Sequence, residues 1–143
     1  LLRADADQQI MRRYRNLPPH LLAAYASCSP GQARVWEAWN RGRLIAGILV
    51  LQHGAAATYQ VGITAPEGRR LNAHNLLLWR AMQHLSDQGC HWMELGTLDH
   101  QSAPGLARFK LGTGARILHL SGTWLYHSAL SRIAGRLPSS LAA

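Results

Sequence analysis

Two adjacent arginines lie where a phosphate-bearing ligand could bind. Arg69 and Arg70 follow an apolar segment that ends near Ile63, and they immediately precede a segment with helical periodicity. The N-terminus of a helix stabilises an anion through the helix dipole, and a guanidinium offers a planar pair of donors to a phosphate. We therefore interpret Arg69 and Arg70 as phosphate contacts. The alternative is that both lie on a solvated loop.

Two carboxylates are candidates for proton transfer. Glu94 is flanked by apolar residues in the segment 90–95, and an apolar environment disfavours an unpaired carboxylate. Such a group suits a general base. Asp99 follows where this segment ends, which is a common place for catalytic side chains. The alternatives are a structural ion pair between Glu94 and an arginine, and a turn or helix cap formed by Asp99.

The histidines and cysteines predict neither a metal site nor a covalent nucleophile. His74 and His84 fall on one predicted helix but about 15 Å apart along its axis, too far to share a metal ion. Cys28 and Cys90 are too few for a disulfide framework or a zinc quartet. We expect His74 to be a site residue near the start of its helix, and Cys90 to be a small core residue.

Length and charge restrict the class of protein. A chain of 143 residues is expected to form one domain, residues 1–143, with a substantial core. The formal net charge is +8, and a single lysine stands among fifteen basic residues. This balance predicts a modest anion site, and an RNA-binding surface is the alternative.

The chain also gives expectations about its location. The longest apolar run spans only 44–51, whereas a membrane-spanning helix needs about 20 residues. The first residues carry no signal-peptide pattern, so we expect a cytoplasmic protein without a membrane span. The chain begins with Leu1 rather than Met, which leaves open that it is the C-terminal part of a longer protein.

The elements that must position these groups are a mixture of helices and strands. A hairpin signal at 40–42 precedes the segment 44–52, which is almost entirely apolar and predicts a strand covered on both faces. The stripe of Leu71, Leu78, Met82 and Leu85 predicts an amphipathic helix. The predicted order is a helical region 5–28 with a break at 17–19, strands 34–39, 44–52 and 56–63, a loop 64–70, a helix 71–88, a strand 90–95, a helix 103–111, a strand 116–127 and a weakly helical tail 128–143.

This order predicts the α/β class, of the α+β type, with a central mixed and mostly antiparallel sheet flanked by helices. Three meandering strands precede a βαβ-like passage, a pattern that does not suit a doubly wound parallel sheet. Asp5 or Asp7 is expected to cap the first helical piece, and Asn72 to cap the long helix. Gly89 is expected to end that helix.

Several segments in this order carry a resemblance to a known family. They are VWEAWNRGRLIAGILVLQHG, TYQVG, HNLLLWRAMQHLSDQG, WMELGTLD and PGLARFKLGTGA, within residues 34–126. The sequence resembles the acyl-CoA N-acyltransferase (GNAT) superfamily, and most closely the branch related to the Fem aminoacyltransferases. The resemblance implies that an amine attacks a thioester or ester carbonyl held beside the third strand, where the strand backbone polarises the carbonyl.

The resemblance also implies roles for individual residues. Arg70 and Ala73 fit the phosphate-binding turn of the family, whereas Asn75 stands where it has a small residue. Lys110 matches the lysine of the Fem Phe-Lys-x-Gly element, which stabilises charge near the transferring ester; the alternative is a helix-end lysine. The residues predicted to be catalytic are Glu94, Asp99, Tyr59 and Lys110. Those predicted to bind the donor are Gln60, Val61, Gly62, Gly68, Arg69, Arg70, Ala73, His74 and Asn75.

The implied function is transfer of an acyl group from acyl-CoA, with acetyl-CoA the expected co-substrate, to a small amine or peptide-like acceptor. One alternative is a Fem-like enzyme that uses aminoacyl-tRNA and acts on a cell-wall precursor. Another is a GNAT-like module without catalysis. The resemblance leaves a homodimer open, and it implies no metal. The family fold begins with a strand that is not legible before residue 5.

Overall fold

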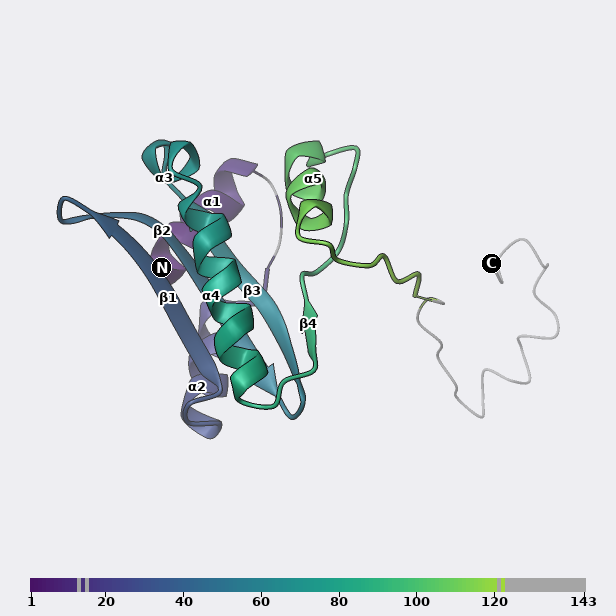
Figure 1. The fold of residues 1–143 in the computed structure, drawn as a ribbon. Helices are drawn as coiled ribbons and strands as arrows, with labels where there is room; N and C mark the ends of the chain where they lie inside the picture. The colour runs from purple at the N-terminus through teal and green to yellow at the C-terminus, as the bar shows by residue number, and fades with distance from the viewer. Residues whose placement is uncertain (13, 15, 121, 123–143) are drawn as a thin grey trace, which may run out of the picture.

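The chain folds as a mixed sheet with helices on both faces (Figure 1). The computed structural model describes residues 1–12, 14, 16–120 and 122. The strand order is β1-β2-β3-β4, in which the first three strands are antiparallel and β4 is parallel to β3. The elements in chain order are α1 (Leu2–Arg12), α2 (Pro19–Cys28), β1 (Ala33–Asn40), β2 (Arg43–His53), β3 (Ala56–Thr64), α3 (Pro66–Arg70), α4 (Ala73–Asp87), β4 (Trp92–Glu94) and α5 (Pro104–Gly112).

The second strand carries the core on both of its faces, as its apolar sequence predicts. Ile48 and Val50 point to the face covered by α4, where they pack in a cluster with Leu77. Leu49 and Leu51 point to the opposite face and join Leu22 of α2. Strand alternation divides one apolar run between two layers, so β2 is fixed from both sides. The predicted fold class is confirmed.

The third strand is irregular at one residue. Leu49 pairs with Val61 and the next residue of β2, Val50, pairs with Tyr59, so Gln60 is an extra residue in β3. This bulge reverses the alternation. Tyr59 packs against the cluster on the α4 side, whereas Val61 is buried in the cluster on the opposite side.

The fourth strand pairs with β3 over a short stretch only. The pairs run from Ala56 with Trp92 to Thr58 with Glu94. The β3 residues after Thr58 therefore have no strand partner on that edge among the described residues. The bulge at Gln60 lies at the start of this open edge.

The long helix is amphipathic as predicted, but its start differs. The side chains of Leu77, Leu78, Ala81 and Leu85 are buried, whereas Leu71 lies before the helix and is exposed. At the C-terminal end, Gly89 takes a positive φ and the N–H of Cys90 donates to the carbonyl of Leu85, which ends the helix as predicted.

Four local predictions are wrong. The predicted loop 64–70 contains the short helix α3, which begins at Pro66. Asn72 takes a left-handed conformation and makes no side-chain cap. Neither Asp5 nor Asp7 precedes α1 as a cap, because both lie within the helix, with Asp5 buried in its first turn. The predicted strand 116–127 is absent from its described part, residues 116–120 and 122, and the rest of it lies outside the described residues, as does the predicted helical tail 128–143.

Within the described part of the chain, no helix combines the length and apolar character that crossing a bilayer requires.

Candidate active site

A polar cluster lies beside the open edge of β3, on the face covered by α4. The hydroxyl of Tyr59 is 2.9 Å from Nε2 of His74, and Oγ1 of Thr64 is 2.7 Å from Nδ1 of the same ring. His74 is in the first turn of α4, and the other two residues are on β3. Both ring nitrogens of His74 are therefore engaged by hydroxyl groups.

An aromatic contact closes the cluster on the side of α5. The ring of Phe109 meets the ring of His74 edge-on, with a centroid distance of 5.2 Å. The ring of Tyr59 also meets His74 edge-on, at 5.7 Å. We use the term Tyr59–His74 cluster for Tyr59, Thr64, His74 and Phe109. It joins β3, α4 and α5.

Gly62 provides the space that this cluster occupies. A Cβ atom at Gly62 would overlap the hydroxyl oxygen of Tyr59 and would lie 2.7 Å from Cε1 of His74. Ordinary carbon contacts are about 3.5–4.0 Å. The absence of a side chain at Gly62 therefore allows Tyr59 to reach His74. The bulge at Gln60 makes this possible because it turns Tyr59 and Gly62 to the same face.

Burial shifts both titrating groups of the cluster away from their charged forms. Desolvation raises the pKa of Tyr59, with smaller contributions from Tyr14 and Asp5. Desolvation lowers the pKa of His74, and a hydrogen bond from the ring to the backbone carbonyl of Ile63 opposes this effect. Near pH 7 the tyrosine is a neutral hydroxyl and the histidine is a neutral ring. A neutral imidazole accepts a hydrogen bond at one nitrogen and donates at the other, so it can exchange a proton with either hydroxyl.

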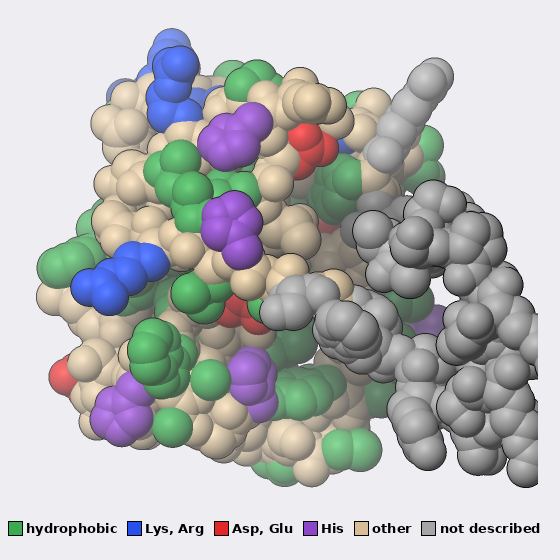
Figure 2. All heavy atoms as spheres, turned by 90° about the vertical axis from the view of Figure 1, so that its right-hand side faces the viewer, with side chains coloured by type: hydrophobic (Ala, Val, Ile, Leu, Met, Phe, Trp, Pro, Cys, Tyr) green, Lys and Arg blue, Asp and Glu red, His purple; other side chains and the backbone are tan. Residues whose placement is uncertain are grey.

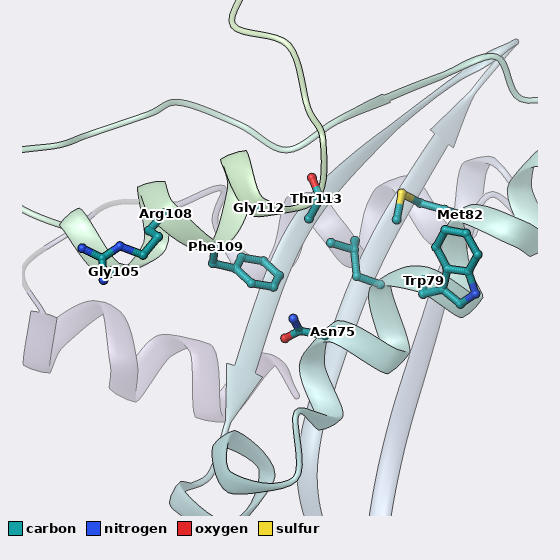
Figure 3. Close-up of a pocket in the computed structure, with 9 residues that line it drawn as sticks. Asn75, Trp79, Met82, Gly105, Arg108, Phe109, Gly112 and Thr113 are labelled. Carbon is teal, nitrogen blue, oxygen red and sulfur yellow. The ribbon is translucent and has the colours of Figure 1, made fainter.

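A cleft of about 560 Å³ lies between α4 and α5, and Phe109 forms part of its wall (Figure 3). In Figure 3 the ring of Phe109 points toward Asn75, whereas Arg108 points away from that ring. Because Phe109 also contacts His74, the cleft adjoins the Tyr59–His74 cluster at this wall. The residues that line the cleft are Asn75, Leu78, Trp79, Met82, Gly105, Arg108, Phe109, Gly112 and Thr113.

The two predicted phosphate contacts are exposed next to the start of α4. Arg69 and Arg70 form the last turn of α3, and Asn72 lies between this turn and Ala73, the first residue of α4. Figure 2 views the side of the molecule that carries β4 and α5, and it shows basic side chains projecting at the top. In Figure 1, α3 lies at the same end of the molecule. Both arginines are exposed beside the start of α4, and their role as phosphate contacts stays a prediction.

Gly68 was predicted to bind the donor, but its role in the structure is in packing. A Cβ atom there would overlap the carbonyl oxygen of Ile45, so Gly68 lets α3 pack directly on β2. It does not lie open for the approach of a ligand, since Gly68 is buried. The side chains of Ala73 and Val61 are buried in the core, which leaves only their backbone groups for a ligand.

Both carboxylate candidates are exposed. Glu94 ends β4 on the outside of the sheet, so the expectation of an apolar environment is wrong. Oδ1 of Asp99 accepts hydrogen bonds from the N–H groups of Gln101 and Ser102, at 2.9 and 2.8 Å. These bonds, that of Ser102 first, lower the pKa of Asp99. Asp99 therefore forms a turn, which was one of the predicted alternatives.

Lys110 is buried, which its position near the end of α5 did not suggest. Its Nζ donates to the carbonyl of Thr97 at 2.8 Å, and only 7% of the residue is exposed. Desolvation lowers the pKa of Lys110, and the charge of Glu94 opposes this shift. The Lys110 side chain thus connects α5 by a hydrogen bond to the loop that follows β4.

Sequence reasoning missed a polar network on the opposite face. The buried carboxylate of Asp5 accepts hydrogen bonds from the Tyr14 hydroxyl at 2.7 Å and from Gln9 Nε2 at 2.8 Å. Gln8 Nε2 donates to Tyr14 at 3.0 Å and to the carbonyl of Gly62 at 3.3 Å. The spacing of polar residues at 5, 8 and 9 on one helix is the signal that could have indicated this face.

The same network reaches the bulge. Asn16 Nδ2 donates to the carbonyl of Gln60 at 2.9 Å, and the amide of Gln60 donates to Oδ1 of Asn16. The carbonyls of Gln60 and Gly62 thus point to the open edge of β3. The N–H and C=O of one strand residue share a direction, so the N–H of Gly62 also faces this edge.

The structure brings some of the predicted residues together and leaves others apart. Tyr59, Gly62 and His74 meet in one cluster, and Asn75 lines the adjoining cleft. Glu94 and Asp99 are outside it. In the described ranges, no group of three or more His, Cys, Asp or Glu side chains is arranged to hold a metal ion.

Comparison with known proteins adds independent findings. Residues 3–111 match the family model described as an acetyltransferase (GNAT) domain. Among solved structures, the aminoglycoside N-acetyltransferase AAC(6')-Iy in complex with CoA is similar in fold, with a TM-score of 0.57 and 10% identity over 76% of this chain and 86% of that chain. The ribosomal-protein-S18-alanine N-acetyltransferase from Escherichia coli matches with a TM-score of 0.46 and 18% identity, over 63% of this chain and 58% of that chain. The comparison with curated proteins found no match.

Proposed function

Because the chain belongs to the GNAT acetyltransferase domain family, we propose that it transfers an acetyl group from acetyl-CoA to an amine acceptor. The observation that carries this proposal is the Tyr59–His74 cluster, which adjoins both the open edge of β3 and the cleft between α4 and α5. A donor in the cleft would have its thioester beside groups that can move a proton. The similar fold of an acetyltransferase that binds CoA supports the same donor.

The donor is proposed to lie along the cleft with its pyrophosphate at the start of α4. The free N–H groups of the first helical turn and the helix dipole favour an anion there. Arg69 and Arg70 are exposed beside this turn and supply cations. Asn75 and Trp79 line the cleft farther along the helix, where the rest of the donor would run.

The proposed reaction is direct attack of the amine nitrogen on the thioester carbonyl. A C–N bond forms, the C–S bond breaks, the amine loses a proton and the thiolate of CoA gains one. The N–H of Gly62 faces the open edge of β3 and can donate to the carbonyl oxygen as negative charge develops there. The hydroxyl of Tyr59 can take the proton from the amine while passing its own to the neutral ring of His74.

The other predicted catalytic residues have supporting roles in this proposal. Glu94 is exposed at the end of β4, where a carboxylate would attract a cationic acceptor. Lys110 holds the loop after β4 through the Thr97 carbonyl, so it positions the wall of the site rather than the reacting atoms. Asp99 stabilises the turn that follows.

Two alternatives differ in the donor or in catalysis itself. A Fem-like enzyme would use aminoacyl-tRNA, and a module without activity would bind neither donor. The matching family model describes an acetyltransferase domain, and the aminoglycoside N-acetyltransferase of similar fold is in complex with CoA. Both findings favour acyl-CoA over aminoacyl-tRNA as the donor.

Thermal melting with acetyl-CoA tests the donor. Ligand at a hundredfold excess over Kd adds about 2.7 kcal/mol of stability, which raises Tm by roughly 5–10 °C in a domain of this size. We expect the double variant Arg69→Ala/Arg70→Ala to lose most of this shift. Arg43→Ala, in the exposed hairpin, is the matched control and should keep it.

Each result has a distinct meaning. No shift in the wild type contradicts an acyl-CoA donor and favours aminoacyl-tRNA or a module without activity. An equal shift in the double variant and the control contradicts the position of the pyrophosphate. Release of free CoA thiol from acetyl-CoA in the presence of a panel of amines then tests for transfer.

A further inference from the structure

The Tyr59–His74 cluster leaves little free space where it meets β3. The Tyr59 hydroxyl occupies the position that a side chain at residue 62 would take, and Cε1 of His74 lies beside it. Tyr59 is also packed against the core cluster of α4 and β2. Neither ring can retreat without losing the hydrogen bond that joins them or disturbing the core.

The cluster also adjoins the cleft. Phe109 lines the cleft and packs edge-on against His74, which in turn bonds to Tyr59. A continuous row of three rings therefore runs from the cleft wall to the backbone of β3. A group that extends from the cleft toward the open edge of β3 meets this row.

We propose that Tyr59, backed by His74 and Phe109, limits the acyl group of the donor to the length of acetyl. This inference rests on the proposed function, since it concerns the acyl end of an acyl-CoA donor. An acetyl group adds only a methyl beyond its carbonyl. Each further methylene must enter the space held by the Tyr59 ring, and well-packed interiors respond to even one added methylene.

The contacts argue for Tyr59 as the limiting side chain rather than its neighbours. His74 is fixed at both ring nitrogens, by Tyr59 and by Thr64, so it serves as the support. Phe109 stands at the cleft wall, before the space beside Gly62 is reached. Tyr59 intrudes furthest into that space: its hydroxyl oxygen would overlap a Cβ at residue 62, whereas Cε1 of His74 would lie 2.7 Å from it. Shortening Tyr59 should therefore admit longer acyl chains.

Calorimetric titration of the full chain with CoA, acetyl-CoA and hexanoyl-CoA tests this proposal. For the wild type we expect CoA and acetyl-CoA to have Kd values within about threefold of each other, and hexanoyl-CoA to bind at least tenfold more weakly. In Tyr59→Ala we expect hexanoyl-CoA to bind within threefold of acetyl-CoA. In Tyr59→Phe, which keeps the ring, the wild-type preference should persist.

The three titrations distinguish failure of the acyl-length limit from failure of the proposed function. If CoA itself does not bind, both fail. If CoA binds and hexanoyl-CoA binds as tightly as acetyl-CoA to the wild type, only the length limit is overturned. The limit is also overturned if Tyr59→Ala folds and keeps the wild-type preference. If Tyr59→Ala shows no melting transition, Tyr59→Leu takes its place because leucine also shortens the side chain at residue 59: a relaxed preference supports the length limit, and an unchanged preference overturns it.

Discussion

Gly62→Ala tests the geometry on which the candidate site depends. The added Cβ would overlap the hydroxyl oxygen of Tyr59 and lie 2.7 Å from Cε1 of His74. Restoring an ordinary carbon contact to Cε1 of His74 requires a shift of about 1 Å, and the Tyr59 hydroxyl must move farther because it overlaps the new Cβ. Such a shift removes the 2.9 Å hydrogen bond between Tyr59 and His74, or moves β3 itself.

The expected magnitude follows from these two effects. Overpacking a well-packed interior costs about 1–3 kcal/mol, and a buried polar group left without its partner costs about 1–3 kcal/mol. Partial relaxation reduces the sum, so we expect Gly62→Ala to lower the free energy of unfolding by about 2–4 kcal/mol. In a domain of this size, Tm should fall by roughly 6–15 °C.

Melting by calorimetry or circular dichroism provides the measurement, and Gly105→Ala provides the matched control. A Cβ at Gly105 has no neighbour within 4 Å, and the residue lies in α5. Alanine in a helix is favoured over glycine by roughly 0.5–1 kcal/mol, so this variant should be slightly more stable than the wild type. A Tm for Gly62→Ala equal to that of Gly105→Ala would refute the reasoning.

A double variant identifies the obstructing group. Tyr59→Phe removes the hydroxyl that the new Cβ would overlap. Adding it to Gly62→Ala should cost less than the two single changes together, by about 0.5–3 kcal/mol, because the two residues touch. Additive losses would mean that the Tyr59 hydroxyl is not what the Cβ meets.

Three further predictions concern other buried groups. Asp5→Asn should lower the free energy of unfolding by about 1–3 kcal/mol, as measured by urea denaturation. The amide NH2 replaces one of the two carboxylate oxygens and would face the donor of either Tyr14 or Gln9. An unchanged midpoint would contradict this prediction. Gly68→Ala should destabilise the fold by at least as much as Gly62→Ala, because the new Cβ meets the backbone carbonyl of Ile45, which cannot rotate away. An unchanged Tm in the same melting experiment would show that α3 can move away from β2. Burial lowers the pKa of His74, so near its ordinary pKa the unfolded chain binds more protons than the folded chain. The free energy of unfolding should therefore fall as the pH is lowered through about 6.5. If His74→Gln keeps the same dependence of this free energy on pH between 7 and 5, the dependence has another source.

The elements with strong periodicity could be predicted from the sequence. The almost wholly apolar run of β2 required cover on two faces, and the structure has it. The stripe of Leu78 and Leu85 identified α4, and Gly89 its end. These signals are local repeats of 2 or 3.6 residues, and burial of one face is enough to produce them.

Positions that depend on distant contacts could not be predicted in this way. Lys110 follows the helix-end pattern, yet its partner is the carbonyl of Thr97, thirteen residues away. Glu94 sits between apolar neighbours in the sequence, yet β4 is a short edge strand among the described residues and leaves it in water. Apolar neighbours in sequence do not fix the burial of a carboxylate when the strand has only one partner.

The candidate site itself depends on an irregularity that no periodic pattern reveals. In TYQVGIT, uniform alternation would put Tyr59, Val61 and Ile63 on one face and Gly62 on the other. The extra residue at Gln60 instead puts Tyr59 and Gly62 on one face, where a glycine is needed because the Tyr59 hydroxyl takes its space. The bulge also begins where β4 leaves β3, so backbone groups and proton-carrying side chains reach the same open edge. A site of this kind is specified by one inserted residue and one missing side chain, which is why the residue types could be predicted from the sequence while their meeting could not.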